Sequence, residues 1–352
     1  MDSRERILTA LRHQEPDRVP VHDSPWAATV ARWRREGLPE DVSPDDYFGF
    51  EIAMLNCDLT PRFPIETIEE TDEFIVQRTR YGSIRKNFRD FSTTPEVIDC
   101  PIKTRDDWPP IRDRLQAADH RGDWEELRRQ VREARAKGRF ICFVGLHGYD
   151  ILQTYISSER LLMAMATDPD WVREMIMTMA TLSVDMARIA MDKGIEFDGF
   201  WNYNDMGYRN GLLFSPHTYR ITHKDADRMV YSFFREHGKP NFLHSCGNVS
   251  ELIPELIEVG LDCLQPLEVK AGMDVRRLKE EFGDDLSFMG GIDVRAMAAD
   301  DPAAIEEEIA SKFQVAKENG GYIYHSDHSV PKNVSFERYQ HVMELVREHG
   351  QY

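Results

Sequence analysis

The chain is 352 residues long, and its 41% hydrophobic and 30% charged residues are ordinary for a globular protein. Its formal net charge of −18 argues against nucleic acid or an anionic membrane as a partner, because both need basic surfaces. No apolar stretch approaches the about 18 residues that span a bilayer, and the first residues lack the apolar region of an export signal. Five cysteines, odd in number and without paired spacing, fit a reducing compartment. We therefore expect a cytoplasmic protein with a small-molecule substrate.

The first hundred residues are less regular than the remainder. Residues 4–13 have helical apolar spacing and predict a first helix, and residues 19–21 predict a short strand. Residues 74–80 and 83–87, separated by Tyr81-Gly82, predict a β-hairpin. We expect residues 45–110 to form an insertion that leaves the main core, and one further strand to lie hidden within residues 50–110.

From residue 139 onward, short apolar strands alternate with long amphipathic helices. The strands are expected at residues 140–146, 197–203, 242–246, 263–267, 286–289 and 322–324. The longest helices between and after them are expected at residues 161–193, 215–237, 250–258 and 335–347. This alternation implies parallel βαβ units, and no dinucleotide-binding fingerprint, P-loop or nucleophile elbow is present. We therefore predict one domain over residues 1–352, a (β/α)8 TIM barrel whose N-terminal excursion contains the hairpin.

A His-x-Cys pair ends the strand expected at residues 242–246. Residues i and i+2 of a strand point to the same side, so His244 and Cys246 project together. This donor pair suits zinc, although a lone His-x-Cys pair also occurs by chance. A second polar cluster at residues 325–328 follows the last apolar run. Because the carboxyl ends of barrel strands form the active site, the two clusters together indicate a metal site at the barrel mouth.

Other polar residues and glycines follow the expected strands. Asp205 and Glu268 could bind the metal, orient His244 or carry a proton, but they could also be a helix cap and an ion-pair partner. His147 lies between glycines that permit close approach of a ligand, and it could equally be a structural histidine. The residues that could let a strand end approach a cofactor, or form a tight turn with a helix cap, are Gly290, Gly291 and Asp293.

Six segments spread over nearly the whole chain carry a family resemblance. They are residues 4–20, 204–211, 244–247, 266–270, 289–293 and 326–331. They resemble the uroporphyrinogen decarboxylase superfamily, whose fold is the barrel inferred above. Decarboxylases of this superfamily have an Arg-Gln-Ala-Gly-Arg segment near the amino terminus, and residues 23–32 lack it. The chain therefore looks more like the cobalamin-dependent methyltransferases of the superfamily.

This resemblance implies a zinc ion held by His244, Cys246 and a third residue, commonly cysteine, near the last strand. The third position falls here at Asp327 or His328. In the family the zinc activates a thiol, which accepts a methyl group from a corrinoid; without a second cysteine the metal could instead act on an oxygen or another acceptor. No corrinoid-binding Asp-x-His-x-x-Gly segment is present, so the cobalamin would come on a separate protein that docks over the barrel mouth.

Two other functions fit the same residues. One is a lyase that decarboxylates a small carboxylated substrate. It is favoured by the absence of a cysteine at the third ligand position and by the many histidines and carboxylates. A tetrapyrrole- or metal-binding protein without activity would need a metal closed in by four protein ligands. The chain could also form a homodimer.

Overall fold

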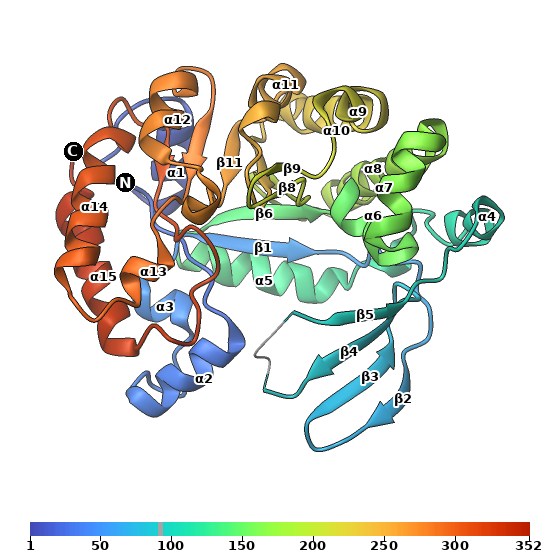
Figure 1. The fold of residues 1–352 in the computed structure, drawn as a ribbon. Helices are drawn as coiled ribbons and strands as arrows, with labels where there is room; N and C mark the ends of the chain where they lie inside the picture. The colour runs from blue at the N-terminus through green and yellow to red at the C-terminus, as the bar shows by residue number, and fades with distance from the viewer. Residues whose placement is uncertain (91–93) are drawn as a thin grey trace.

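A curled parallel sheet of seven strands forms the centre of this computed structural model, which describes residues 1–90 and 94–352. Neighbouring strands are parallel throughout. Their order is β1 (Ile52–Asn56), β6 (Phe140–Gly145), β7 (Gly199–Tyr203), β10 (Asn241–His244), β11 (Cys263–Gln265), β12 (Ser287–Met289) and β13 (Tyr322–Ile323). The strand expected within residues 50–110 is therefore β1, which lies beside β6 (Figure 1).

The segment at residues 19–22 lies between the two ends of this sheet. Val21 forms a parallel bridge with Tyr324, just after β13. The carbonyl of Val21 also accepts the Glu51 backbone N–H at 2.9 Å, just before β1. The strand expected at residues 19–21 is reduced to one bridge because the chain turns toward the loop after β13 beyond His22. The result is a curled, TIM-barrel-like half-barrel of seven strands, and this short segment connects its two edges through a few backbone contacts.

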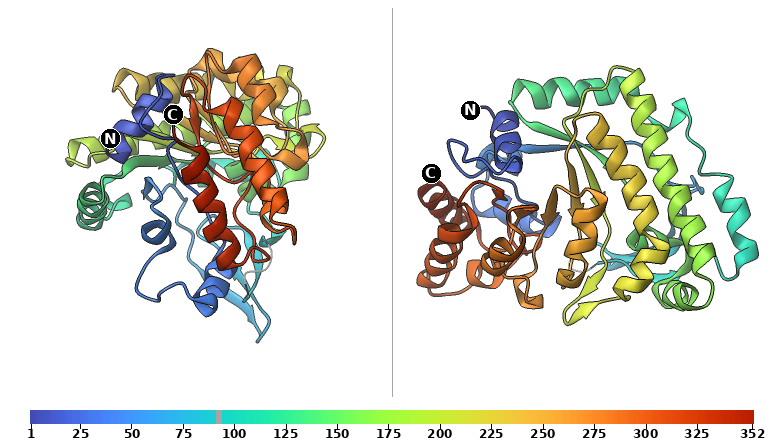
Figure 2. Two further views of the ribbon diagram at one scale, coloured as in Figure 1. Left: turned by 90° about the vertical axis from the view of Figure 1, so that its left-hand side faces the viewer. Right: turned by 90° about the horizontal axis from the view of Figure 1, so that it is seen from above.

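Helices follow most strands and pack on the outer face of the sheet, while both termini lie on one side of the molecule (Figure 2). None of the helices within the described ranges is both long and apolar enough to cross a membrane. The helices are α1 (Ser3–Leu11), α2 (Ala27–Glu36), α3 (Pro44–Phe48), α4 (Trp108–Arg112), α5 (Trp124–Ala136), α6 (Tyr149–Ile156), α7 (Ser158–Thr167), α8 (Pro169–Asp192), α9 (Pro216–Thr222), α10 (Lys224–Glu236), α11 (Ile253–Val259), α12 (Val275–Phe282), α13 (Val294–Met297), α14 (Ala303–Ala316) and α15 (Phe336–His349).

The longest helix, α8, illustrates how the sequence sets these boundaries. The Asp168 side chain accepts the Trp171 N–H and caps its first turn, while Pro169 occupies a first-turn position where no N–H is needed. The chain turns at Gly194, which has φ +74°. Met175 and Met179 are fully buried on one face of the helix, so both side chains serve packing.

Successive side chains along each strand point alternately into two apolar cores, one on each side of the sheet. The inner core fills the barrel and receives Ile7 from α1. Its strand members are Ile52, Phe140, Cys142, Val144, Trp201, Phe242, Cys263, Met289 and Ile323. The outer core, which includes Leu55 and Phe143, lies between the sheet and the helices. Membership of one core or the other therefore tells which side of the barrel wall a side chain occupies.

The N-terminal insertion contains an antiparallel sheet of four strands that projects away from the barrel (Figure 1). Their order is β2 (Glu66–Glu70), β3 (Phe74–Arg78), β4 (Ile84–Phe88) and β5 (Glu96–Asp99). The antiparallel β3–β4 pair occupies the residues expected for the hairpin. The two outer strands were not expected, because all of their residues are exposed and no apolar face marks them.

Candidate metal centre

Three donor atoms meet where β10 ends. The Cys246 sulfur lies 3.4 Å from His244 Nε2. Asp205 Oδ1 lies 3.5 Å from the same nitrogen and accepts the Cys246 backbone N–H at 2.8 Å. Tetrahedral zinc, with nitrogen at about 2.0 Å and sulfur at about 2.3 Å, places these two ligand atoms roughly 3.5 Å apart. The spacing of the three donors therefore fits a single zinc ion.

Glu268 and His328 bring two further donors to Cys246. One ligand atom from each of these three residues lies within 4.8 Å of the others. Glu268 is held in place, since Oε2 accepts the Gly247 N–H at 2.9 Å and Oε1 lies 3.0 Å from Lys270 Nζ. Burial lowers the pKa of His328, and the Lys270 charge lowers it further, which favours the neutral imidazole that binds metals. We call Asp205, His244, Cys246, Glu268 and His328 the candidate metal centre.

Gln265 determines which nitrogen of His244 faces this centre. His244 Nδ1 lies 2.6 Å from Gln265 Oε1, and an amide oxygen can only accept, so Nδ1 donates. The Gln265 amide nitrogen lies 3.3 Å from His325 Nε2. That nitrogen can accept, because His325 Nδ1 donates to the Ser326 carbonyl at 2.6 Å. The chain of hydrogen bonds therefore leaves the lone pair of His244 on Nε2, facing the centre.

The electrostatics of Cys246 fit a bound cation. Burial raises the pKa of its thiol, and the Asp205 and Glu268 carboxylates raise it further. The protein groups alone thus keep the thiol protonated among acidic neighbours. A divalent cation would reverse this balance, because it favours the thiolate and neutralises the carboxylates. Sulfur, imidazole nitrogen and carboxylate oxygen together are a donor set that zinc accepts.

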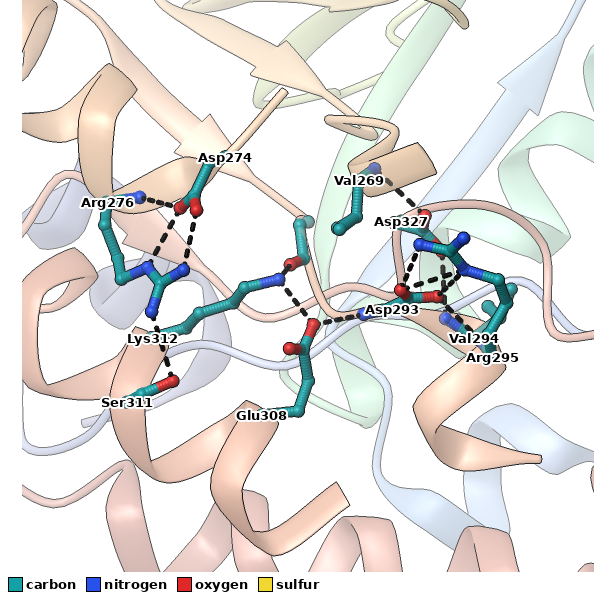
Figure 3. A network of polar contacts seen from close by, with 12 residues as sticks. Val269, Asp274, Arg276, Asp293, Val294, Arg295, Glu308, Ser311, Lys312 and Asp327 are labelled. Carbon is teal, nitrogen blue, oxygen red and sulfur yellow. Dashed lines mark hydrogen bonds and ion pairs between the residues drawn. The ribbon is translucent and has the colours of Figure 1, made fainter. Parts of the chain in front are cut away.

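Of the two candidates near the last strand, the structure brings His328 rather than Asp327 to the centre. Asp327 Oδ2 accepts the Val269 N–H and Oδ1 accepts the Val294 N–H, both at 3.0 Å (Figure 3). Burial raises the pKa of Asp327 to about 6. Its carboxylate belongs to neither group of metal-binding donors found within the described residues. The geometry therefore does not support Asp327 as the third ligand.

Gly290, Gly291 and Asp293 form a tight turn followed by a helix cap. A Cβ atom on Gly290, which has φ +120°, would lie 1.9 Å from the Pro266 carbonyl oxygen. Asp293 caps α13, and its carboxylate pairs with Arg295 at 2.6 Å (Figure 3). These contacts match the structural alternative, and a cofactor-binding role for the three residues stays a prediction.

His147 is fully buried within a different polar network. Its Nε2 lies 2.8 Å from Asp227 Oδ1, and the other Asp227 oxygen accepts the Tyr219 hydroxyl at 2.7 Å. Its backbone N–H donates to Asn202 at 3.3 Å. His147 is not among the donors of the candidate metal centre in the described part of the chain, so these contacts match a structural histidine.

Asp150, in the first turn of α6, was missed by sequence reasoning. Burial raises its pKa to about 6, and the negative charge of Asp205 raises it further, while His244 has the opposite effect. Its backbone N–H donates to Asn204 Oδ1 at 3.1 Å. An acidic residue three positions after His147 at a strand exit was the available signal, but helix first turns commonly carry such residues.

Comparison with one solved structure supports this fold. A methyltransferase from Methanosarcina mazei superposes with a TM-score of 0.69 over 99% of both chains, at 16% sequence identity. An alpha-amylase from Geobacillus thermoleovorans covers 66% of this chain and 62% of its own, with a TM-score of 0.38 and 11% identity. No curated protein matches the sequence. The family model described as uroporphyrinogen decarboxylase (URO-D) matches residues 116–349. With more than half of its length matched by that model, the chain belongs to the uroporphyrinogen decarboxylase family.

Proposed function

We propose that the protein is a zinc-dependent methyltransferase that moves a methyl group between a corrinoid and a small acceptor or donor, such as a thiol. The observation that carries this proposal is the donor set around Cys246, in which sulfur and His244 Nε2 are 3.4 Å apart. Membership of the family and a fold shared with a methyltransferase support it. Carboxylate and imidazole are both accepted zinc ligands, and either would take the place of the missing second cysteine.

In this proposal His244 and Cys246 hold the zinc. Asp205 completes one group of donors with them, and Glu268 and His328 complete a second group that shares the Cys246 sulfur. Bound zinc would lower the pKa of a substrate thiol and so supply a thiolate nucleophile. Asp205 Oδ1, which is 3.5 Å from His244 Nε2, is placed to take the proton that the thiol releases. Glu268 stays oriented by the Gly247 N–H and could serve the same purpose.

The corrinoid in this proposal comes on a separate protein. The chain has no Asp-x-His-x-x-Gly segment of its own, and the five donors of the candidate metal centre gather at the carboxyl ends of β7, β10, β11 and β13. A large methyl carrier can reach this end of a barrel only from above the strands. We therefore expect a corrinoid protein to dock over the barrel mouth.

Metal analysis combined with a methyl-transfer assay tests this function. Purified protein should contain one zinc per chain and should convert methylcobalamin to the demethylated form when thiols are added, followed by visible absorbance. A chelator should abolish transfer, and added zinc should restore it. Protein that takes up no metal contradicts the proposal and favours the lyase alternative. Protein that binds zinc but methylates no thiol contradicts the choice of acceptor.

Replacement of Gln265 should weaken zinc binding without touching a ligand. In Gln265→Leu the hydrogen bond to His244 Nδ1 is lost, so the imidazole no longer holds its lone pair on Nε2. Loss of such an outer hydrogen-bond partner typically lowers metal affinity about 10–100-fold. Competition with a chromophoric chelator measures the zinc Kd. Gln265→Glu keeps an acceptor and should retain affinity, whereas an unchanged Kd in Gln265→Leu would show that the contact does not orient His244.

A further inference from the structure

A cavity of about 660 Å³ runs beside β1, between α2, α3 and α5. We call it the β1 channel. Every residue of β1 lines it, together with His22, Tyr203 and side chains of the three helices. Its volume lies within the range of about 300–1,000 Å³ that is usual for small-molecule sites.

The β1 channel passes through the barrel wall. Ile52 belongs to the inner apolar core, and Tyr203 packs against that core. Leu55 and Ala134 belong to the outer core, and Val30 packs against it. Since all five residues line one cavity, the space joins the inside of the barrel to the side where the helices lie.

The wall is open here because one edge of β1 is unpaired. The last backbone contact on this edge is the hydrogen bond from Glu51 to Val21. The chain then turns away, and Val330 bonds instead to Ser24 and Trp26, each at 3.2 Å. Among the described residues, no backbone hydrogen bond joins Ile52–Asn56 to this segment. Backbone N–H and C=O groups of an edge strand are therefore available to a ligand in the channel.

The inner end of the β1 channel carries an unpartnered imidazole. His22 is only 7% exposed, and its Nδ1 has no hydrogen-bond partner among the described residues. Burial lowers the pKa of His22 to about 3, so the ring is neutral near pH 7. A buried polar atom without a partner is costly, and a ligand that bonds to it removes this cost. The ring of Tyr203, which lines the channel, is centred 5.1 Å from that of His244.

Most charged groups along the β1 channel are paired with other side chains. Lys137 and Arg139 both bind the Asp46 carboxylate, at 2.7 Å and 2.8 Å. Asp23 accepts four hydrogen bonds from the protein, one of them from the Tyr339 hydroxyl at 2.7 Å. Glu133 pairs with Arg129 at 2.6 Å. Asp45 also lines the channel; burial raises the pKa of its carboxyl, and the Arg139 and Lys137 charges lower it. An anion would therefore lack a free cation among these groups, a cation would compete with Arg139 and Lys137 for Asp45, and an uncharged ligand needs no counter-charge.

We propose that the β1 channel binds an uncharged small organic molecule, which hydrogen-bonds to His22 and reaches the candidate metal centre from the side of the barrel. As a route for the substrate this inference rests on the proposed function, but as a binding site it stands independently. Entry from the side leaves the barrel mouth free for the corrinoid protein. The two reactants then approach the metal centre from different directions.

Three probes with one ring and different charges test the class of ligand. Phenol, benzoate and benzylammonium are titrated into the purified protein at pH 7, and binding is followed by calorimetry and by ligand-detected NMR. Phenol should bind saturably, and both ions should bind at least tenfold more weakly. Tighter binding of either ion overturns the ligand class. No saturable phenol binding up to about 10 mM overturns the site.

Two variants locate the binding site. Asn56→Trp, at an exposed position of the channel wall, should fill the channel and weaken phenol binding at least tenfold, with an unchanged Tm. His22→Leu should weaken it similarly. Ile68→Trp, on the exposed strand β2, is the matched control and should leave binding unchanged. Unaltered phenol affinity in both channel variants overturns the proposal. These binding experiments contain no methyl donor, so their outcome does not depend on whether the protein transfers methyl groups.

Discussion

Cys246→Ser and His244→Ala are each expected to yield folded protein that binds no zinc and transfers no methyl group. Both side chains contribute donor atoms to the candidate metal centre, with 3.4 Å between them. Removal of an outer hydrogen-bond partner typically lowers metal affinity about 10–100-fold, and removal of a ligand should lower it further. Elemental analysis and the methylcobalamin assay measure the two effects, and circular dichroism verifies the fold.

Cys57→Ser is the matched control for this experiment. Cys57 is also a free, half-buried cysteine, and it lies outside both groups of metal-binding donors in the described ranges. Its replacement should leave one zinc per chain and full activity. A Cys246→Ser protein that retains zinc with wild-type affinity would contradict the assignment of the sulfur as a ligand.

Glu51→Ala is expected to lower the free energy of unfolding by about 3 kcal/mol, because it removes a buried carboxylate from Arg6, which then keeps only that of Asp17, and leaves the Val21 N–H without its acceptor. The Glu51 side chain is 2% exposed and pairs with Arg6, whose side chain is 8% exposed, and with Arg18 at 3.0 Å. It also accepts the Val21 N–H at 2.6 Å. Glu51 therefore holds the short segment that closes the sheet, and denaturant unfolding measures its contribution.

Asp185→Ala provides the comparison for Glu51→Ala. Asp185 pairs with Arg188 at 3.0 Å on the surface of α8, where solvent screens the interaction. Such exposed pairs contribute about 0–1 kcal/mol, so this variant should unfold almost like the wild type. A Glu51→Ala protein that is equally stable would show that the closing segment does not depend on the carboxylate.

Much of the fold could be read from the alternation of strands and helices. The strands after residue 139 lie where apolar runs predicted them, because strands buried on both faces are continuously apolar. A short strand was predicted at residues 19–21, but its reduction to one bridge could not be read, since it depends on backbone contacts with distant segments. That residues 1–352 form one domain stays a prediction, as do the corrinoid protein and a homodimer.

The sequence by itself determined that His244 and Cys246 share one side of a strand end, because their spacing matches the period of a strand. It also placed Asp205, Glu268 and His328 at strand ends. Only the tertiary structure decided that His328, and not Asp327, reaches Cys246, and that His147 belongs elsewhere. Which of two adjacent side chains faces a site depends on backbone direction after the strand and on contacts with residues far away in the chain. Those contacts exist only in the folded chain, and the same is true of the channel beside β1.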